Sequence, residues 1–275
     1  MFTLNCKGRL LVIDKPIIMG IINTTPDSFY SASRKNDIDE ILFQTEKMIH
    51  EGAIIIDIGG QSTRPGSIQV GTNEELKRTI PAIDAIRKNF PDIFISIDTF
   101  YSAVAQKNVE AGADIVNDIS GGNMDAAMLS TVATLKVPYV CMHMQGTPDN
   151  MQQNPVYENV TKEVLDFFIR KIEDCRLAGI NDVIVDIGFG FGKTIEHNFQ
   201  LLKYLPIFKM LQKPLLLGVS RKSSIYKTLN ITPEESLNGT TVLNTVGLLN
   251  GANILRVHDV KQAKEAVDLI NKLQA

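Results

Sequence analysis

Short apolar runs alternate along the chain with longer stretches in which apolar residues recur every three or four positions. Most of the runs are continuously apolar, which is typical of parallel strands that helices cover on both faces. The runs lie at residues 17–23, 53–60, 93–98, 114–119, 137–143, 182–188, 214–220 and 253–258. Eight strands, each followed by a helix, predict a (β/α)8 TIM barrel. A doubly wound open sheet remains the alternative, because periodicity does not show whether a sheet closes.

The stretches of helical period fill the gaps between these runs. They are expected at residues 38–51, 73–89, 101–111, 124–135, 158–178, 195–204, 234–250 and 261–273. Thr72 or Asn73 is a candidate cap for the second of them. Ahead of the first strand, Lys7 and Gly8 mark the turn of a short N-terminal hairpin. Since no Pro- or Ser-rich linker interrupts the pattern, residues 1–275 are expected to form a single domain.

Composition and charge narrow the possible functions. The chain is 44% hydrophobic and 21% charged, as is usual for a globular protein. Its formal net charge is −3 and it has no Lys/Arg-rich run, so neither a nucleic-acid nor a membrane partner is expected. The three cysteines, Cys6, Cys141 and Cys175, are widely spaced, which argues against a disulfide framework and a zinc site. The N-terminal segment lacks a signal-peptide core, so a cytoplasmic location is expected.

Polar residues follow almost every predicted strand. They are Asn23, Asp27, Asp57, Asp98, Asn117, Asp118, His143, Asp186, Ser220, Arg221, Lys222, Arg256 and His258. Taken singly, an Asp or Asn in such a place is usually a turn former or a helix cap. In a barrel, however, the C-terminal strand ends meet at one mouth, where active sites lie. Apart from His143, the set therefore predicts an active site. His143 is interpreted as a near-core histidine, and His50 and His197 as surface residues of helices, so none of the three is given a functional role.

Two loops carry further chemistry. Residues 186–194 read DIGFGFGKT, which fails the phosphate-binding P-loop pattern because Ile187 stands where its first glycine belongs. A dinucleotide-binding fingerprint is also excluded, since the loop follows the sixth predicted strand. What remains is a turn whose glycines let backbone approach a ligand and whose phenylalanines can pack on a flat ring. In the STRPG loop, residues 62–66, Arg64 is suited to grip a carboxylate or phosphate.

These motifs, in this order and spacing, resemble the dihydropteroate synthases, a family of pterin-binding folate-pathway enzymes. The resemblance covers nearly the whole chain through IMGIINTTPDSF, IIDIGGQSTRPG, SIDT, NDIS, MHMQGTP, GFGFGK, SRKS and RVHDV. It implies a barrel-shaped transferase that joins 6-hydroxymethyl-7,8-dihydropterin pyrophosphate to 4-aminobenzoate and releases pyrophosphate with the help of Mg²⁺. It also implies a dissociative substitution, a homodimer and a sulfonamide target.

The resemblance further implies a role for each matching residue. Pterin binding is expected of Asp98, Asn117, Asp186, Lys222 and Arg256. Pyrophosphate binding is expected of Asn23, Thr63, Arg64, Arg256 and His258, with Asn23 also the Mg²⁺ ligand. Aminobenzoate binding is expected of Phe29, Thr63, Arg64, Pro65, Phe191, Ser220 and Lys222. The catalytic set is Asp27, Asp98, Lys222 and Arg256.

The sequence departs from the family pattern at three places, and two alternative functions remain to be weighed. Ile187 stands where the family commonly has proline, Gln61 where it has glutamate, and residues 30–36 form an unusual first loop. The rivals are a pterin-binding methyltransferase of the corrinoid type and a non-catalytic pterin-binding paralogue. The first has no use for STRPG, GFGFGK and SRKS together, and the second should lack Lys222. Residues 234–250 and 261–273 are the expected dimer face.

Overall fold

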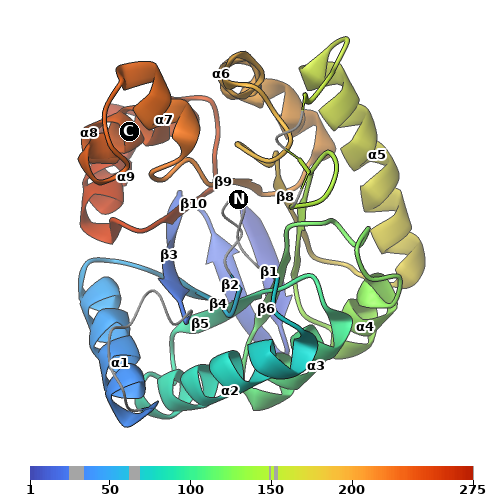
Figure 1. Cartoon of the computed structure of the whole chain (residues 1–275), viewed down its shortest axis with the longest axis vertical. Helices are drawn as coiled ribbons and strands as arrows, with labels where there is room; N and C mark the ends of the chain where they lie inside the picture. Colours follow the sequence, from blue (N-terminus) through green and yellow to red (C-terminus); the bar gives the residue numbers. More distant parts are fainter. Residues whose placement is uncertain (25–33, 62–68, 149, 152–153, 275) are drawn as a thin grey trace.

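Eight parallel strands form a closed barrel in the computed structural model, which describes residues 1–24, 34–61, 69–148, 150–151 and 154–274 (Figure 1). The strands are β3 (Ile17–Asn23), β4 (Ile55–Gly59), β5 (Phe94–Asp98), β6 (Ile115–Asp118), β7 (Tyr139–Met142), β8 (Val183–Asp186), β9 (Leu215–Leu217) and β10 (Ile254–Val257). Each pairs with the next, and β10 pairs with β3 to close the ring. The TIM-barrel prediction is confirmed, and the open sheet is excluded.

Helices surround the barrel in a ring (Figure 1). They are α1 (Arg34–His50), α2 (Thr72–Asn89), α3 (Ser102–Ala111), α4 (Met128–Leu135), α5 (Val160–Ala178), α6 (Ile195–Lys203), α7 (Ser223–Leu229), α8 (Leu237–Leu249) and α9 (Val260–Gln274). Outward-facing strand residues such as Ile56, Ile97 and Val185 are buried against them in the main apolar core. None of the described helices is both long and apolar enough to cross a lipid bilayer.

Two local predictions about helices were wrong. Helix α7 was not expected, because seven residues are too few to show a helical period. The cap of α2 was also misassigned: Thr72 is already helical, and Gly71 lies at the cap position without a side-chain cap bond. The backbone oxygen of Gly71 instead accepts hydrogen bonds from the amides of Glu74 and Glu75.

The predicted N-terminal hairpin is present and closes the bottom of the barrel. Strands β1 (Phe2–Cys6) and β2 (Arg9–Ile13) are antiparallel, and Lys7 and Gly8 both have positive φ, as a type I′ turn requires. Apolar hairpin side chains pack with inward-facing residues from the starts of the barrel strands; this cluster comprises Leu4, Cys6, Leu11, Ile13, Ile17, Met19, Ile55, Ile115, Val140, Ile184, Leu216 and Ile254. With its N-terminal end filled in this way, the barrel leaves its C-terminal end for chemistry.

Candidate active site

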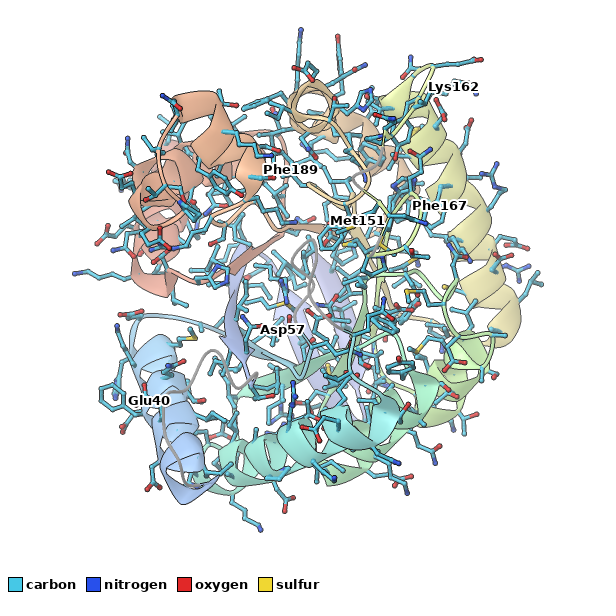
Figure 2. All side chains as sticks on the ribbon, viewed as in Figure 1. Glu40, Asp57, Met151, Lys162, Phe167 and Phe189 are labelled. Atoms are coloured by element: carbon cyan, nitrogen blue, oxygen red, sulfur yellow. The ribbon has the colours of Figure 1, made fainter. Side chains whose placement is uncertain are left out.

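Charged and amide side chains from separate strands gather at the C-terminal end of the barrel. They are Asp57 in β4, Asp98 at the end of β5, Asn117 in β6, Asp186 at the end of β8, Lys222 after β9 and Arg256 in β10. Figure 2 labels Asp57 near the centre of the ring of strands. The sheet register pairs Gly59 with Asp98, and Asp98 with Asn117, so these strand ends lie side by side.

Arg256 bridges two carboxylates. Its Nε lies 2.6 Å from Asp57 Oδ2, and its Nη2 lies 2.6 Å from Asp98 Oδ2. The Nδ2 of Asn117 also donates to Asp57 Oδ2, at 3.1 Å. Asp57 is fully buried, and its Oδ1 has no hydrogen-bond partner among the described residues. The single guanidinium of Arg256 thus pairs with two carboxylates, and within the described part of the chain the Oδ1 of Asp57 remains as an acceptor without a donor.

Burial raises the pKa of two acids at this end of the barrel, Asp98 and Asp186. Burial raises the pKa of Asp98 to about 7, although the Arg256 guanidinium lowers it, and the nearby Asp57 carboxylate raises it further. Burial likewise raises the pKa of Asp186, against the lowering influence of Lys222. The charged forms of these acids therefore lack part of the stabilisation that water would give, and a ligand with donors or positive charge would supply it.

Lys222 lies against the glycine-rich loop that follows β8. Its Nζ donates to the backbone oxygen of Phe189 and lies 4.5 Å from the centroid of the Phe191 ring. A Cβ on Gly190, whose φ is +88°, would lie 3.1 Å from the Cδ of Lys222, so the close approach needs glycine. Burial lowers the pKa of Lys222 to about 8, while the Asp186 carboxylate raises it.

Ser220 and His258 form a second polar pair at the rim. The Oγ of Ser220 accepts a hydrogen bond from the backbone amide of His258 and lies 3.0 Å from its ring Nδ1. A hydroxyl that accepts from the amide can still either donate to Nδ1 or accept from it, so the pair holds the imidazole in place with the proton on either ring nitrogen.

Asn23, at the end of β3, faces Asp98 across Gly59. Asn23 Oδ1 and Asp98 Oδ2 lie 3.4 and 3.9 Å from the point where a Cβ on Gly59 would be. Within the part of the chain that the structure describes, no group of three or more His, Cys, Asp or Glu residues could hold a metal ion. An amide and a carboxylate oxygen are nevertheless ligands that Mg²⁺ accepts when water and phosphate complete its shell. The donor set fits Mg²⁺ bound together with a diphosphate.

Some predicted site residues cannot be placed. Asp27 and Phe29 in the first loop, and Thr63, Arg64 and Pro65 in the second, lie outside the described residues. The others, Asn23, Asp98, Asn117, Asp186, Phe191, Ser220, Lys222, Arg256 and His258, lie in or directly after barrel strands.

Two residues were given no role from the sequence. Asp57 was noted only as a strand-end acid, although a carboxylate inside the apolar run AIIIDIGG is itself a signal of a buried partner. Lys193 was read as part of a loop motif, yet it is 3% exposed and its Nζ lies 3.0 Å from His143 Nδ1. Burial and the neighbouring Lys193 lower the pKa of His143 to about 2, so this imidazole is neutral.

Comparisons with known proteins show which family this chain resembles. The model of the pterin-binding enzyme family matches residues 19–258. Dihydropteroate synthase of Escherichia coli K12 is 42% identical over 266 residues, which cover 96% of this chain and 94% of that protein. The Yersinia pestis dihydropteroate synthase in a sulfonamide drug complex superposes with a TM-score of 0.93, at 39% identity and 99% coverage of both chains. That of Xanthomonas albilineans in complex with 7,8-dihydropteroate gives 0.87, at 34% identity and 99% and 98% coverage.

Proposed function

The chain belongs to the dihydropteroate synthases of the pterin-binding enzyme family, and we propose from this premise that it joins 6-hydroxymethyl-7,8-dihydropterin pyrophosphate to 4-aminobenzoate. The products are 7,8-dihydropteroate and pyrophosphate. The observation that carries the proposal is the buried Asp57–Arg256–Asp98 bridge, with Asn117, Asp186 and Lys222 around it, at the open end of the barrel. Asp98, Asn117, Asp186, Lys222 and Arg256 each have a counterpart on a pterin.

The pterin ring presents a different set of donors and acceptors on each edge. Its 2-amino and N3 donors suit the buried carboxylate of Asp186, and Asn117 supplies both a donor and an acceptor to the neighbouring edge. Lys222 donates to O4 and N5, while Asp98 lies near N8. Arg256 lays its planar guanidinium on the ring face. The pterin then provides hydrogen-bond donors for the buried acids.

The reaction is a dissociative substitution at the methylene carbon. The C–O bond breaks first, its electron pair leaves with pyrophosphate, and the positive charge spreads into the pterin ring. Asp98 stabilises that charge in its ionised form. The amine of aminobenzoate then attacks the methylene and releases a proton. Asn23 would hold Mg²⁺, which neutralises charge on the leaving diphosphate when it is bound.

Groups on the last strands and on two loops complete the substrate sites in this proposal. Arg256 and His258 face the leaving diphosphate, together with Thr63 and Arg64 from the second loop. Phe191, Phe29 and Pro65 contact the aminobenzoate ring, while Ser220 and Lys222, with Thr63 and Arg64, receive its carboxylate. Asp27 joins the catalytic set from the first loop. Sulfonamides, which resemble aminobenzoate, are expected to compete with it.

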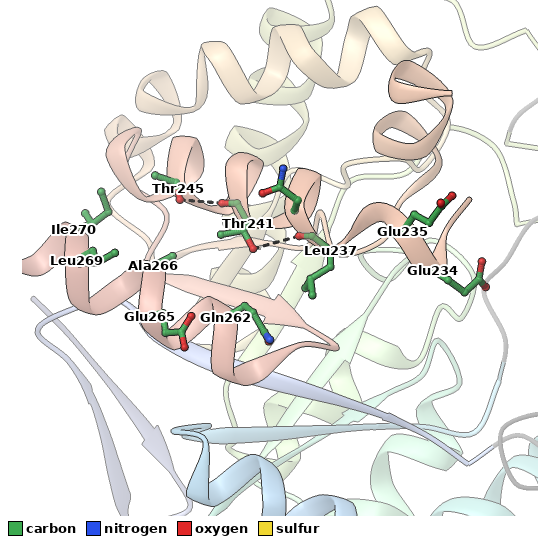
Figure 3. A pocket seen from close by; sticks show the side chains of 11 residues that line it. Glu234, Glu235, Leu237, Thr241, Thr245, Gln262, Glu265, Ala266, Leu269 and Ile270 are labelled. Atoms are coloured by element: carbon green, nitrogen blue, oxygen red, sulfur yellow. Dashed lines mark hydrogen bonds between the residues drawn. The ribbon is translucent and has the colours of Figure 1, made fainter. Parts of the chain in front are cut away.

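A homodimer through α8 and α9 is part of the same proposal. Val242, Leu249, Leu269 and Leu273 on these helices are between 49% and 73% exposed, which is unusual for large apolar side chains on one face. Between the helices lies a hollow of about 660 Å³ whose walls include Thr241, Thr245, Ala266 and Ile270 (Figure 3). Sedimentation at micromolar concentration tests the dimer, and a monomer alone would reject it. The proposal treats residues 1–275 as one domain and places it in the cytoplasm.

The decisive experiment is a coupled assay for pyrophosphate release by the purified chain. Release should require both substrates and Mg²⁺, and 7,8-dihydropteroate should accumulate in equal amount. Release without aminobenzoate would show hydrolysis instead of synthesis. Binding of the pterin without turnover would favour a non-catalytic paralogue, and methyl transfer from a reduced folate would favour the corrinoid-type enzyme.

A further inference from the structure

Lys193 is a buried cation that the proposed chemistry does not use. It closes the glycine-rich loop, and its Nζ has four acceptors within 3.3 Å: the backbone oxygens of Gly188, Phe191 and His143, and the ring Nδ1 of His143. A neutral amine offers two donors, whereas an ammonium offers three. The number of acceptors favours the charged form, although burial lowers the pKa of Lys193; the Asp186 carboxylate raises it.

The acceptors of Lys193 include both ends of one turn, residues 188–191. The amide of Phe191 donates to the oxygen of Gly188 at 3.0 Å, and Lys193 binds the oxygens of these same two residues at 2.9 Å each. The ammonium therefore links the two ends of the turn to each other and to His143, which directly follows β7.

The turn is also pressed against the backbone that follows β7. A Cβ on Gly188 would lie 1.8 Å from the oxygen of His143, and one on Gly192 would lie 2.4 Å from the oxygen of Gln145. The hydroxyl of Tyr157 donates to the oxygen of Gly192 at 2.8 Å. Close contacts and hydrogen bonds thus fix the turn against the segment that follows β7.

The turn also contacts groups assigned to substrate. Lys222 donates to the oxygen of Phe189, and its Nζ lies over the ring of Phe191. Asp98, Asn117 and Arg256, in contrast, are held by their own strands and by one another. A change in the turn should consequently move Phe191 and Lys222 more than it moves the rest of the pterin site.

We propose that Lys193 is a positioning residue for aminobenzoate binding. Its ammonium holds the turn at 188–191, and the turn sets the Phe191 ring and the Lys222 side chain against which aminobenzoate binds. The inference rests on the proposed function, because it assumes that aminobenzoate is the second substrate. Lys193 itself touches no reacting atom.

The test replaces Lys193 by methionine, which keeps the length of the side chain and removes the donors. A hydrogen bond from a charged group is worth about a 10- to 150-fold change in an equilibrium, so Lys193→Met should raise the KM for aminobenzoate at least ~10-fold. The KM for the pterin pyrophosphate should rise by a smaller factor than the KM for aminobenzoate, because three of its five proposed partners, Asp98, Asn117 and Arg256, do not depend on the turn. Lys203→Met, on the exposed face of α6, is the matched control and should change neither constant.

Each outcome decides a separate question. A Lys193→Met enzyme with both KM values unchanged and only a lower melting temperature would show a merely structural role and overturn the inference. If that variant does not fold, Tyr157→Phe loosens the same turn by removing one hydroxyl; a KM for aminobenzoate raised about 2- to 5-fold supports the inference, and an unchanged one overturns it. A wild-type chain that releases no pyrophosphate with both substrates would instead reject the proposed function.

Discussion

Each end of the barrel holds a cluster of arginine and aspartate, but the balance of charge is opposite. At the N-terminal end, two arginines serve one acid: Asp114 Oδ2 lies 2.5 Å from Arg87 and 3.3 Å from Arg9, and it also accepts the amide of Ile95 at 2.9 Å. At the C-terminal end, one arginine serves two acids, since Arg256 bridges Asp57 and Asp98.

The two clusters also differ in what they leave unsatisfied. The remaining donors of Arg87, and those of Arg9 other than Nε, reach the backbone oxygens of Pro91, Ile93 and Gly112. The Arg9 guanidinium stacks 4.3 Å from the Phe94 ring centroid, and its Nε has no hydrogen-bond partner among the described residues. Asp57 Oδ1, by contrast, has no partner among the described residues, and the pKa of Asp98 is raised to about 7. Within the described chain, the N-terminal cluster thus leaves one donor without a partner, whereas the C-terminal cluster leaves an acceptor on a fully buried acid, which a ligand with donors can use.

The largest expected effect comes from removing the cation at the C-terminal end. Arg256→Met leaves two buried acids without their shared partner, and breaking a buried pair costs about 3–5 kcal/mol. If the reaction draws on this cluster, kcat/KM should fall at least ~10²-fold, since each 1.4 kcal/mol is tenfold. Steady-state pyrophosphate release measures the loss. A variant that is folded by circular dichroism and retains a tenth of the activity would contradict the functional reading of this cluster.

A smaller loss is expected from the acid assigned to the pterin donors. Asp186→Asn keeps the shape of the side chain and one acceptor, but it loses the charge-assisted pair, which is worth about 1.5–3 kcal/mol or a 10- to 150-fold change in Kd. Isothermal titration with the pterin pyrophosphate measures it. Asp182→Asn, at the N-terminal end of the same strand, is the control and should bind as the wild type does. Equal affinity for the Asp186 variant would remove that residue from the pterin site.

The barrel could be predicted from the sequence because buried parallel strands are continuous apolar runs, and such runs are visible without any partner. Runs 53–60 and 182–188, for example, correspond to β4 and β8. Helix α7 could not, since its seven residues make too few turns to show periodicity. Closure of the sheet also has no local signal, because it depends on β10 pairing with β3.

The candidate site, too, could be predicted from the sequence only in part. Asp98, Asn117 and Asp186 stand at strand ends, where polar residues are conspicuous after an apolar run. The role of Asp57 could not be predicted, because it depends on an ion pair with Arg256, which is 199 positions away in the sequence. Lys193 looks like any loop lysine until packing places four acceptors around its ammonium. The pKa of Asp98 likewise follows from burial and neighbours that only the fold brings together.

The N-terminal cluster offers a matching test, in which a substitution should lower the stability of the fold and leave the kinetics unchanged. Arg87→Met removes donors to Asp114 and to three backbone oxygens, and should lower the free energy of unfolding by about 1.5–3 kcal/mol, a fall in Tm of roughly 3–12 °C. Differential scanning calorimetry measures the shift, with the exposed neighbour Lys88→Met as control. The KM and kcat of the folded enzyme should stay within about twofold of wild type. A selective rise in either KM would mean that the two ends of the barrel are coupled.

The smallest expected effect is a change in the shape of the pH profile. The reaction needs Asp98 ionised, so kcat/KM should rise as the pH passes about 7, and it needs Lys222 protonated, so kcat/KM should fall above about 8. Lys222→Arg keeps a cation that does not lose its proton in this range. Its overall activity will be lower, but the fall of about tenfold per pH unit on the alkaline side should disappear while the acid side stays in place. If the alkaline limb persists in Lys222→Arg, another group controls it, and the surplus of acids at this end of the barrel is not balanced by Lys222.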